Sequence, residues 1–152
     1  MVWFLQGITR LLLTKIPFYK EVVIASFFCS HCGFENNEIQ SAGEIQRQGV
    51  HYTLDAKLPE DLNRQVIKSD YASLQIPQLE LEVPRLTQKG EITTVEGILQ
   101  RVITALEQDQ DRRKEEYPED YERIQAFIQR VQLCLSMETP FTLVGHMYSF
   151  AP

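Results

Sequence analysis

Cysteine is scarce in this chain of 152 residues, which contains three, at positions 29, 32 and 134. Three cysteines cannot build the disulfide framework that stabilises small secreted domains. A close pair in a chain that is otherwise poor in cysteine is typical of a metal half-site or a redox pair in a reducing compartment. We therefore expect an intracellular protein.

Long hydrophobic runs and basic clusters are also missing. The longest apolar run, residues 22–28, is interrupted by Ser26 and is far shorter than the roughly 20 residues that span a bilayer. The first residues lack the charged segment of a secretory signal peptide. Fifteen Lys and Arg residues stand against twenty-one Asp and Glu residues, giving a net charge of −6. This charge balance disfavours electrostatic binding to nucleic-acid phosphates. We therefore expect protein partners and no direct contact with nucleic acid or membrane.

Motifs of the common catalytic sites are absent from the sequence. It contains no Gly-rich phosphate loop, no Gly-x-Ser-x-Gly and no His-Glu-x-x-His, and its three histidines have no carboxylate partners by spacing. The adjacent carboxylates of Glu115, Glu116, Glu119 and Asp120 lie in a charged stretch that is typical of a solvated turn. We expect a protein that is not an enzyme.

The first two thirds of the sequence are dominated by patterns of β-strands. Its hydrophobic fraction of 43% is enough for the core of one domain. Apolar residues and turn signals divide the chain into short strands, whereas the amide-rich and acidic stretch 35–48 is typical of a loop. The close spacing of the strands indicates a sandwich or jelly-roll-like barrel. The strands are expected at 8–16, 22–28, 51–58, 64–68, 71–76 and 78–83.

Helical periodicity begins after residue 90. Thr93 and Glu96 have the spacing of a capping box, and apolar residues then recur at helical intervals as far as Leu106. A charged link, 109–116, precedes Pro118, which can open a second amphipathic helix. The two helices predict an antiparallel hairpin over about 93–137, and residues 141–144 predict a strand that returns to the β layer. The expected fold class is α+β.

The pair Cys29-x-x-Cys32 is the one segment with the spacing of metal ligands. Two thiolates at this spacing fit one edge of a zinc tetrahedron, and Gly33 allows the tight turn that they need. Two further ligands are required; the candidates are His31, His51, Cys134 and His146. A redox role for the pair is the competing interpretation, although no helix is expected directly after it. Cys134 lies on a predicted helix, where a single cysteine is more often a small core residue.

The polar segment 34–43 has two open interpretations. It is either a recognition loop held out by the cysteine turn or an ordinary surface loop. In the first case the partner-binding residues are Asn36, Asn37, Glu38, Gln40 and Ser41.

Two long strings, ITRLLLTKIPF at 8–18 and CSHCGFENNEIQSAG at 29–43, resemble the Zpr-type zinc finger proteins of eukaryotes. Shorter matches lie at 63–66, 88–90, 93–97 and 106–110, so that the resemblance covers about 7–144. It implies a four-cysteine finger, a helical hairpin and a double-stranded β-helix in each half of a duplicated protein. The expected domains are then a truncated zinc ribbon with its loop at 1–48 and a β-helix domain carrying the hairpin at 49–152.

The resemblance also implies a function. Such proteins bind translation elongation factor 1-alpha and act as its folding chaperone, associate with receptor tyrosine kinase tails and the survival motor neuron protein, and move between cytoplasm and nucleus. Cys29 and Cys32 would be zinc ligands in an incomplete site, because the second cysteine of the family's upstream pair would fall at about Trp3. We expect an N-terminal half that is truncated at both ends. The alternatives are a metal-free structural or decoy fragment and an oxidoreductase using both thiols.

Overall fold

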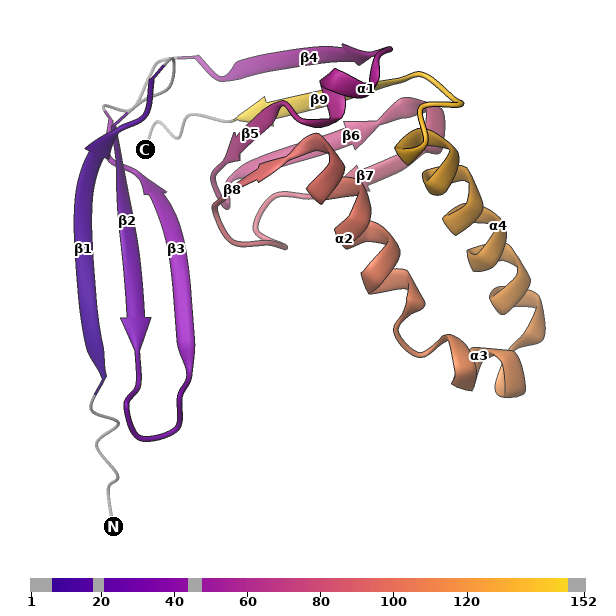
Figure 1. Cartoon of the computed structure of the whole chain (residues 1–152), viewed down its shortest axis with the longest axis horizontal. Coiled ribbons are helices and arrows are strands. Elements are labelled where there is room, and N and C mark those ends of the chain that lie inside the picture. Colours follow the sequence, from indigo (N-terminus) through magenta and orange to yellow (C-terminus); the bar gives the residue numbers. More distant parts are fainter. Residues whose placement is uncertain (1–6, 18–20, 44–47, 148–152) are drawn as a thin grey trace.

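The computed structural model describes residues 7–17, 21–43 and 48–147, which form three antiparallel sheets and a group of helices. Figure 1 shows an arch, in which one sheet descends on one side and the helices descend on the other. The elements are β1 (Ile8–Lys15), β2 (Glu21–Phe28), β3 (Glu35–Ser41), β4 (Val50–Ala56), α1 (Pro59–Leu62), β5 (Gln65–Lys68), β6 (Ala72–Ile76), the 3-10 turn η1 (Pro77–Leu79), β7 (Leu81–Val83), β8 (Glu91–Thr94), α2 (Val95–Glu107), α3 (Gln110–Glu116), α4 (Pro118–Leu135) and β9 (Phe141–Met147).

The descending sheet, here called the finger sheet, has the order β1-β2-β3. Ile8 pairs with Phe28 and Lys15 with Glu21, so β1 and β2 match along their full lengths, as the two apolar runs predict. The segment 35–48, expected to be a loop, instead begins with β3, whose Glu35 pairs with Phe28. The tight turn after β2 aligns the polar residues with a neighbouring strand, and these backbone hydrogen bonds outweigh the low β propensity of the side chains.

The second and third sheets are built from β4 to β9. The four-stranded sheet has the order β4-β9-β6-β7, and β5 pairs with β8 in a separate two-stranded sheet. The expected returning strand is confirmed as β9, which lies between β4 and β6 and pairs with both. The expected strand 78–83 is wrong in its first half, since η1 occupies that position and Glu80 has a left-handed backbone (φ 53°) before β7. The short strand β8 was not expected.

The helices α2 and α4 lie side by side and run in opposite directions (Figure 1). The charged stretch 109–116 is not an irregular link, because Gln110–Glu116 forms α3. Asp109 turns the chain with a left-handed backbone (φ 63°), and the Arg113 guanidinium donates to the carbonyls of Leu106 (3.0 Å) and Gln108 (2.7 Å). Carbonyls at the end of α2 are thereby satisfied, which allows a new helix to start at once.

One hydrophobic core joins the helices to the four-stranded sheet. Its most deeply buried members include Leu99 of α2, Val131 and Cys134 of α4, Ile76 of β6 and Phe141 of β9. Cys134 is thus a core residue, as its place on a predicted helix indicates. No helix in the described part of the chain is long and apolar enough to cross a membrane.

The finger sheet meets the rest of the molecule at the loop before β8. The Ile39 amide donates to the carbonyl of Gly90 (3.3 Å), and the Lys89 ammonium donates to the side-chain oxygen of Asn36. Gly90 is buried, and a Cβ at this position would lie 2.1 Å from the carbonyl oxygen of Ile39. A residue without a side chain is therefore required where the two parts touch.

Candidate functional site

The cysteine pair forms the tip of the finger sheet, between β2 and β3. The Gly33 amide donates to the carbonyl of Cys29, and the Cys29 amide donates to the carbonyl of Phe34, both at 2.9 Å. Gly33 has a left-handed backbone (φ 72°), which a glycine adopts at no steric cost. This turn, residues 29–33, is called the knuckle below.

The two thiols of the knuckle lie in different surroundings. Cys29 is 2% exposed, whereas Cys32 is exposed. The backbone amides of Cys32 and His31, together with the Cys32 thiol, donate toward the sulfur of Cys29 and lower the pKa of its thiol. Donors directed at a sulfur stabilise its thiolate form, which is the form that binds metal. The knuckle therefore fits one half of a zinc site.

Of the other candidate ligands, His31 lies in the knuckle itself, between the two cysteines, whereas Cys134, His51 and His146 lie elsewhere in the structure. Cys134 is buried in the core, where burial raises the pKa of its thiol. The rings of His51 and His146 contact each other across β4 and β9, with centroids 4.4 Å apart and planes tilted by 34°. Among the described residues, no group of three or more His, Cys, Asp or Glu side chains could hold a metal ion. Position 3, where the resemblance would align an upstream cysteine, lies outside the described residues.

The five predicted partner-binding residues lie on β3, and the strand divides them between two faces. Asn36, Glu38 and Gln40 point to one face, and Asn37 and Ser41 to the other, because side chains alternate along a strand. Asn36 accepts a hydrogen bond from Lys89, and Gln40 donates to the carboxylate of Glu38 (3.1 Å). The segment is thus an ordered sheet edge that could carry recognition, rather than a loop.

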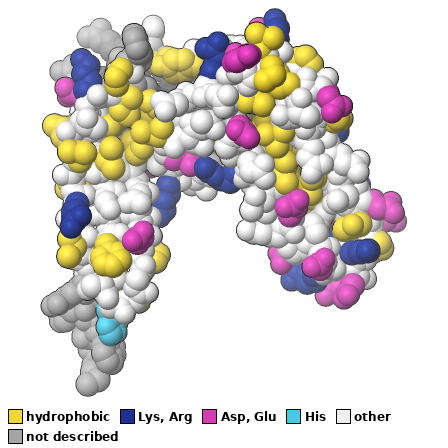
Figure 2. All heavy atoms as spheres, in the orientation of Figure 1, with side chains coloured by type: hydrophobic (Ala, Val, Ile, Leu, Met, Phe, Trp, Pro, Cys, Tyr) yellow, Lys and Arg dark blue, Asp and Glu magenta, His cyan; other side chains and the backbone are white. Residues whose placement is uncertain are grey.

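Exposed leucines on β1 are the feature that the site predictions missed. Leu11, Leu12 and Leu13 are 69%, 59% and 64% exposed. Leu11 pairs with Ala25 of β2 and Leu13 with Val23. On the far side of β2, Ala25 pairs with Glu38 of β3 and Val23 with Gln40. Figure 2 shows hydrophobic side chains gathered over the upper part of this sheet on the face in view. The sequence contains a signal for this exposure. A strand with one buried face alternates apolar and polar residues, whereas three consecutive leucines place apolar side chains on both faces of β1.

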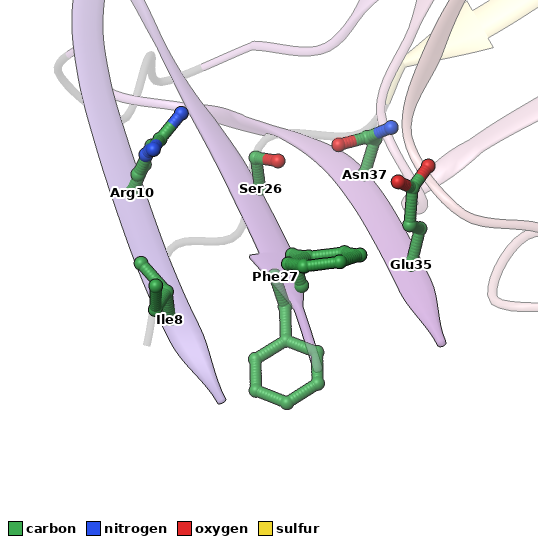
Figure 3. A pocket seen from close by; sticks show the side chains of 7 residues that line it. Ile8, Arg10, Ser26, Phe27, Glu35 and Asn37 are labelled. Atoms are coloured by element: carbon green, nitrogen blue, oxygen red, sulfur yellow. The ribbon is translucent and has the colours of Figure 1, made fainter. Parts of the chain in front are cut away.

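Two hollows open beside the finger sheet. One, of about 270 Å³, lies near the knuckle on the face of the sheet that carries Arg10, Ser26 and Asn37 (Figure 3). The other, of about 530 Å³, lies between the end of β1, the strand β5 and the β4-β9-β6 sheet. Its lining mixes apolar residues with polar and charged ones, among them Arg64 and Lys68. Lys68 is buried; its ammonium lies 3.5 Å from the Glu91 carboxylate, and burial lowers its pKa. That cation is therefore already paired within the protein.

Comparison with known proteins places both parts of the chain in one family. Residues 4–47 match the model of the ZPR1 zinc-finger domain, and residues 60–145 match that of the ZPR1 jelly-roll domain. The zinc finger protein ZPR1 of Homo sapiens is 51% identical over 139 residues, and that of Drosophila melanogaster is 50% identical over 141 residues. The zinc finger chaperone zpr1 of Schizosaccharomyces pombe is 47% identical over 139 residues.

These alignments cover 91%, 93% and 91% of this chain but only 30%, 31% and 30% of the three relatives. The chain thus spans about a third of the length of the curated relatives that it matches. The jelly-roll match agrees with the antiparallel sheets and helices of residues 60–145, and the zinc-finger match covers the finger sheet and its knuckle. On these grounds the chain belongs to the ZPR1 zinc finger family.

Proposed function

We propose that this chain is a non-catalytic zinc-finger module that binds translation elongation factor 1-alpha and assists its folding. The observation that carries the proposal is the unusual exposure of the finger sheet, whose β1 presents three leucines to solvent. Exposed apolar patches of this kind mark protein-binding surfaces. The Schizosaccharomyces pombe relative is named a zinc finger chaperone, and a chaperone needs such a surface to hold an incompletely folded client.

One face of the finger sheet is best suited to this role. Leu11 and Leu13 lie at its β1 side and Val23 and Ala25 at its centre, and β3 adds the polar pair of Glu38 and Gln40. We call these six residues the finger face. An apolar centre bordered by polar groups is the composition of protein interfaces. The finger face thus combines two of the predicted partner-binding residues, Glu38 and Gln40, with two of the leucines that the predictions missed.

A pull-down with purified elongation factor 1-alpha tests the proposal, using both the nascent and the GDP-bound protein as bait. We expect the double variant Leu11→Asp/Leu13→Asp to lose binding at least tenfold, because two carboxylates would have to be buried against the partner. Leu12→Asp is the matched control: its side chain is similarly exposed on the same strand, but it points to the opposite face. Retained binding by the double variant would exclude the finger face.

The alternative is a metal-free structural or decoy fragment without folding activity. It predicts that the wild-type chain binds neither form of the elongation factor and leaves its refolding yield unchanged. Binding that survives Cys29→Ser would show instead that the strands carry recognition without the metal.

We include the remaining expectations from the sequence in this proposal. They are association with receptor tyrosine kinase tails and the survival motor neuron protein, a distribution between cytoplasm and nucleus, and closure of the β4–β9 strands as a double-stranded β-helix carrying a helical hairpin. Cell fractionation and pull-downs with each partner test the first two. Support for the last comes from the jelly-roll match and from the central place of β9 in its sheet.

A further inference from the structure

The knuckle offers half of the ligands that a structural zinc site needs. Such sites take four ligands in a tetrahedron, and the knuckle supplies the thiols of Cys29 and Cys32. The third cysteine of the chain, Cys134, is fully buried in the core beside Val131 and Leu99 and belongs to a different part of the fold. No cluster of three candidate ligands occurs among the described residues. The residues that the structure describes would therefore fill two of the four positions around a zinc ion at the knuckle.

The position of the knuckle leaves the other two coordination positions accessible. It lies at the far end of the finger sheet from the β4–β9 sheets (Figure 1). Its contact with the main body is made further back along β3, through Asn36 and Ile39. Cys29 is buried and Cys32 is exposed, so a second group of ligands would approach the metal from the side of Cys32.

The surface around the knuckle is apolar as well as exposed. Phe34 follows the knuckle and is 57% exposed, and its ring packs against Phe27 with centroids 6.2 Å apart. Phe28 and Ile8, which pair across β1 and β2, are also exposed at this end of the sheet. A partner that contacts the metal would thus bury apolar side chains at the same time, which adds to the stability of the contact.

We propose that two copies of this chain share one zinc ion, each supplying Cys29 and Cys32. A two-fold axis through the metal would relate the copies, which is the commonest symmetry of protein dimers and requires no further ligand type. Each thiol gives up its proton to solvent on binding, so the four thiolates surround the divalent ion without any change of redox state. The site is incomplete without the second copy, and the apolar rim of Phe34, Phe28 and Ile8 meets its own counterpart.

This inference concerns metal and self-association alone and does not depend on binding of an elongation factor. The experiment titrates zinc chloride into the purified chain in the presence of a phosphine reductant, which prevents disulfides. Zinc per chain is measured by elemental analysis after gel filtration, and mass by light scattering. We expect one zinc ion per two chains and a mass that doubles from 17.7 kDa, reversed by a chelator.

Two variants separate this site from other causes of association. Cys32→Ser changes an exposed side chain, so it should fold normally while losing at least tenfold in zinc affinity and failing to dimerise. Cys134→Ala is the matched cysteine control and should keep both properties, because that thiol lies in the core. Circular dichroism checks the fold of each variant. Cobalt(II) in place of zinc should give the intense visible spectrum of a tetrahedral thiolate site in the dimer.

Three results would overturn the proposal. The first is one tightly held zinc ion per monomer, which would mean that a single chain completes the tetrahedron. The second is a dimer that forms equally well with chelator or in Cys32→Ser, which would place the contact elsewhere. The third is no zinc binding when zinc and chain are mixed at equal concentration.

Discussion

At the scale of single residues, Asp61 is held in its charged form by the turn around it. Its carboxylate accepts hydrogen bonds from the amides of Lys57 (3.0 Å) and Leu58 (3.1 Å) and from the guanidinium of Arg64 (2.9 Å). The Lys57 amide, then Arg64, then the Leu58 amide lower the pKa of Asp61 to about 2. A depressed folded-state pKa means that this stabilisation is complete above the unfolded pKa of about 3.9 and is lost as the pH falls toward 2.

We therefore predict that Asp61→Asn lowers the free energy of unfolding at pH 7 and that its deficit shrinks between pH 4 and pH 2. Urea denaturation of both proteins across this range measures the difference. Glu82→Gln, which neutralises an exposed carboxylate on β7, serves as the control and should show no comparable pH dependence. A deficit for Asp61→Asn that is constant from pH 7 to pH 2 would contradict the proposed role of the charge.

Gly90 is a second residue whose identity is dictated by its neighbours. An alanine Cβ there would lie 2.1 Å from the carbonyl oxygen of Ile39, which is backbone and cannot swing aside. We predict that Gly90→Ala costs roughly 1–3 kcal/mol, as overpacking usually does, and that it accelerates hydrogen exchange of the Ile39 amide. Gly145→Ala is the control, since its nearest neighbour would lie at an ordinary 3.6 Å. Equal stability of the two variants would count against the tight junction.

At the scale of elements, the sequence predicts strands and helices well where apolar residues repeat with a clear period. This holds for β1, β2, α2 and α4, whose ends all lie within two residues of the expected ones. It fails for β3 and α3, which are mostly polar. Strand β3 exists because β2 and the knuckle align it, and α3 exists because Arg113 reaches back to carbonyls at the end of α2. These hydrogen bonds between neighbouring elements leave no hydrophobic periodicity in the sequence from which β3 or α3 could be predicted.

The same limit applies to the candidate site: a local sequence pattern could be recognised, but a surface assembled from several strands could not. Cys29 and Cys32 are recognisable because metal ligands have a fixed local spacing. The finger face could not be predicted as a unit, because it combines Leu11 and Leu13 with Glu38 through a strand order that only the folded chain reveals. Strand β3 was expected to be a loop, and without it there is no third strand on which to place the polar residues.

The start of α2 gives a prediction at the same scale. The spacing of Thr93 and Glu96 indicated a cap at Thr93, whereas the Thr94 hydroxyl accepts from the Gly97 amide (3.0 Å) in the structure. We predict that Thr94→Val costs about 0.5–2 kcal/mol, the usual effect of losing an N-cap. Thr93→Val, which removes a hydroxyl of the same shape one residue earlier, should cost less. Thermal denaturation of the two variants measures the difference. A larger loss of stability in Thr93→Val than in Thr94→Val would indicate that Thr93 is the N-cap.

At the scale of the whole molecule, the core and the finger sheet contrast sharply. The helices and the four-stranded sheet enclose one apolar core, while the finger sheet projects to one side (Figure 1) and leaves most of β1 exposed. Strand β1 is also a sheet edge, so its outer backbone groups are free to pair with another extended chain. The basic residues Arg10 and Lys15 protect the two ends of β1, but its leucine centre has no such protection.

This arrangement predicts that β1 limits the solubility of the chain. A charged residue at the centre of an edge strand opposes pairing with another strand, so Leu12→Lys should reduce light scattering on heating at least severalfold. Because Leu12 is exposed, the same change should alter the free energy of unfolding by less than about 0.5 kcal/mol. Leu133→Lys adds the same charge at an exposed position on α4 and controls for net charge. If both variants suppressed aggregation equally, the edge of β1 would not be its origin, and the net charge of −6 would have to be considered instead.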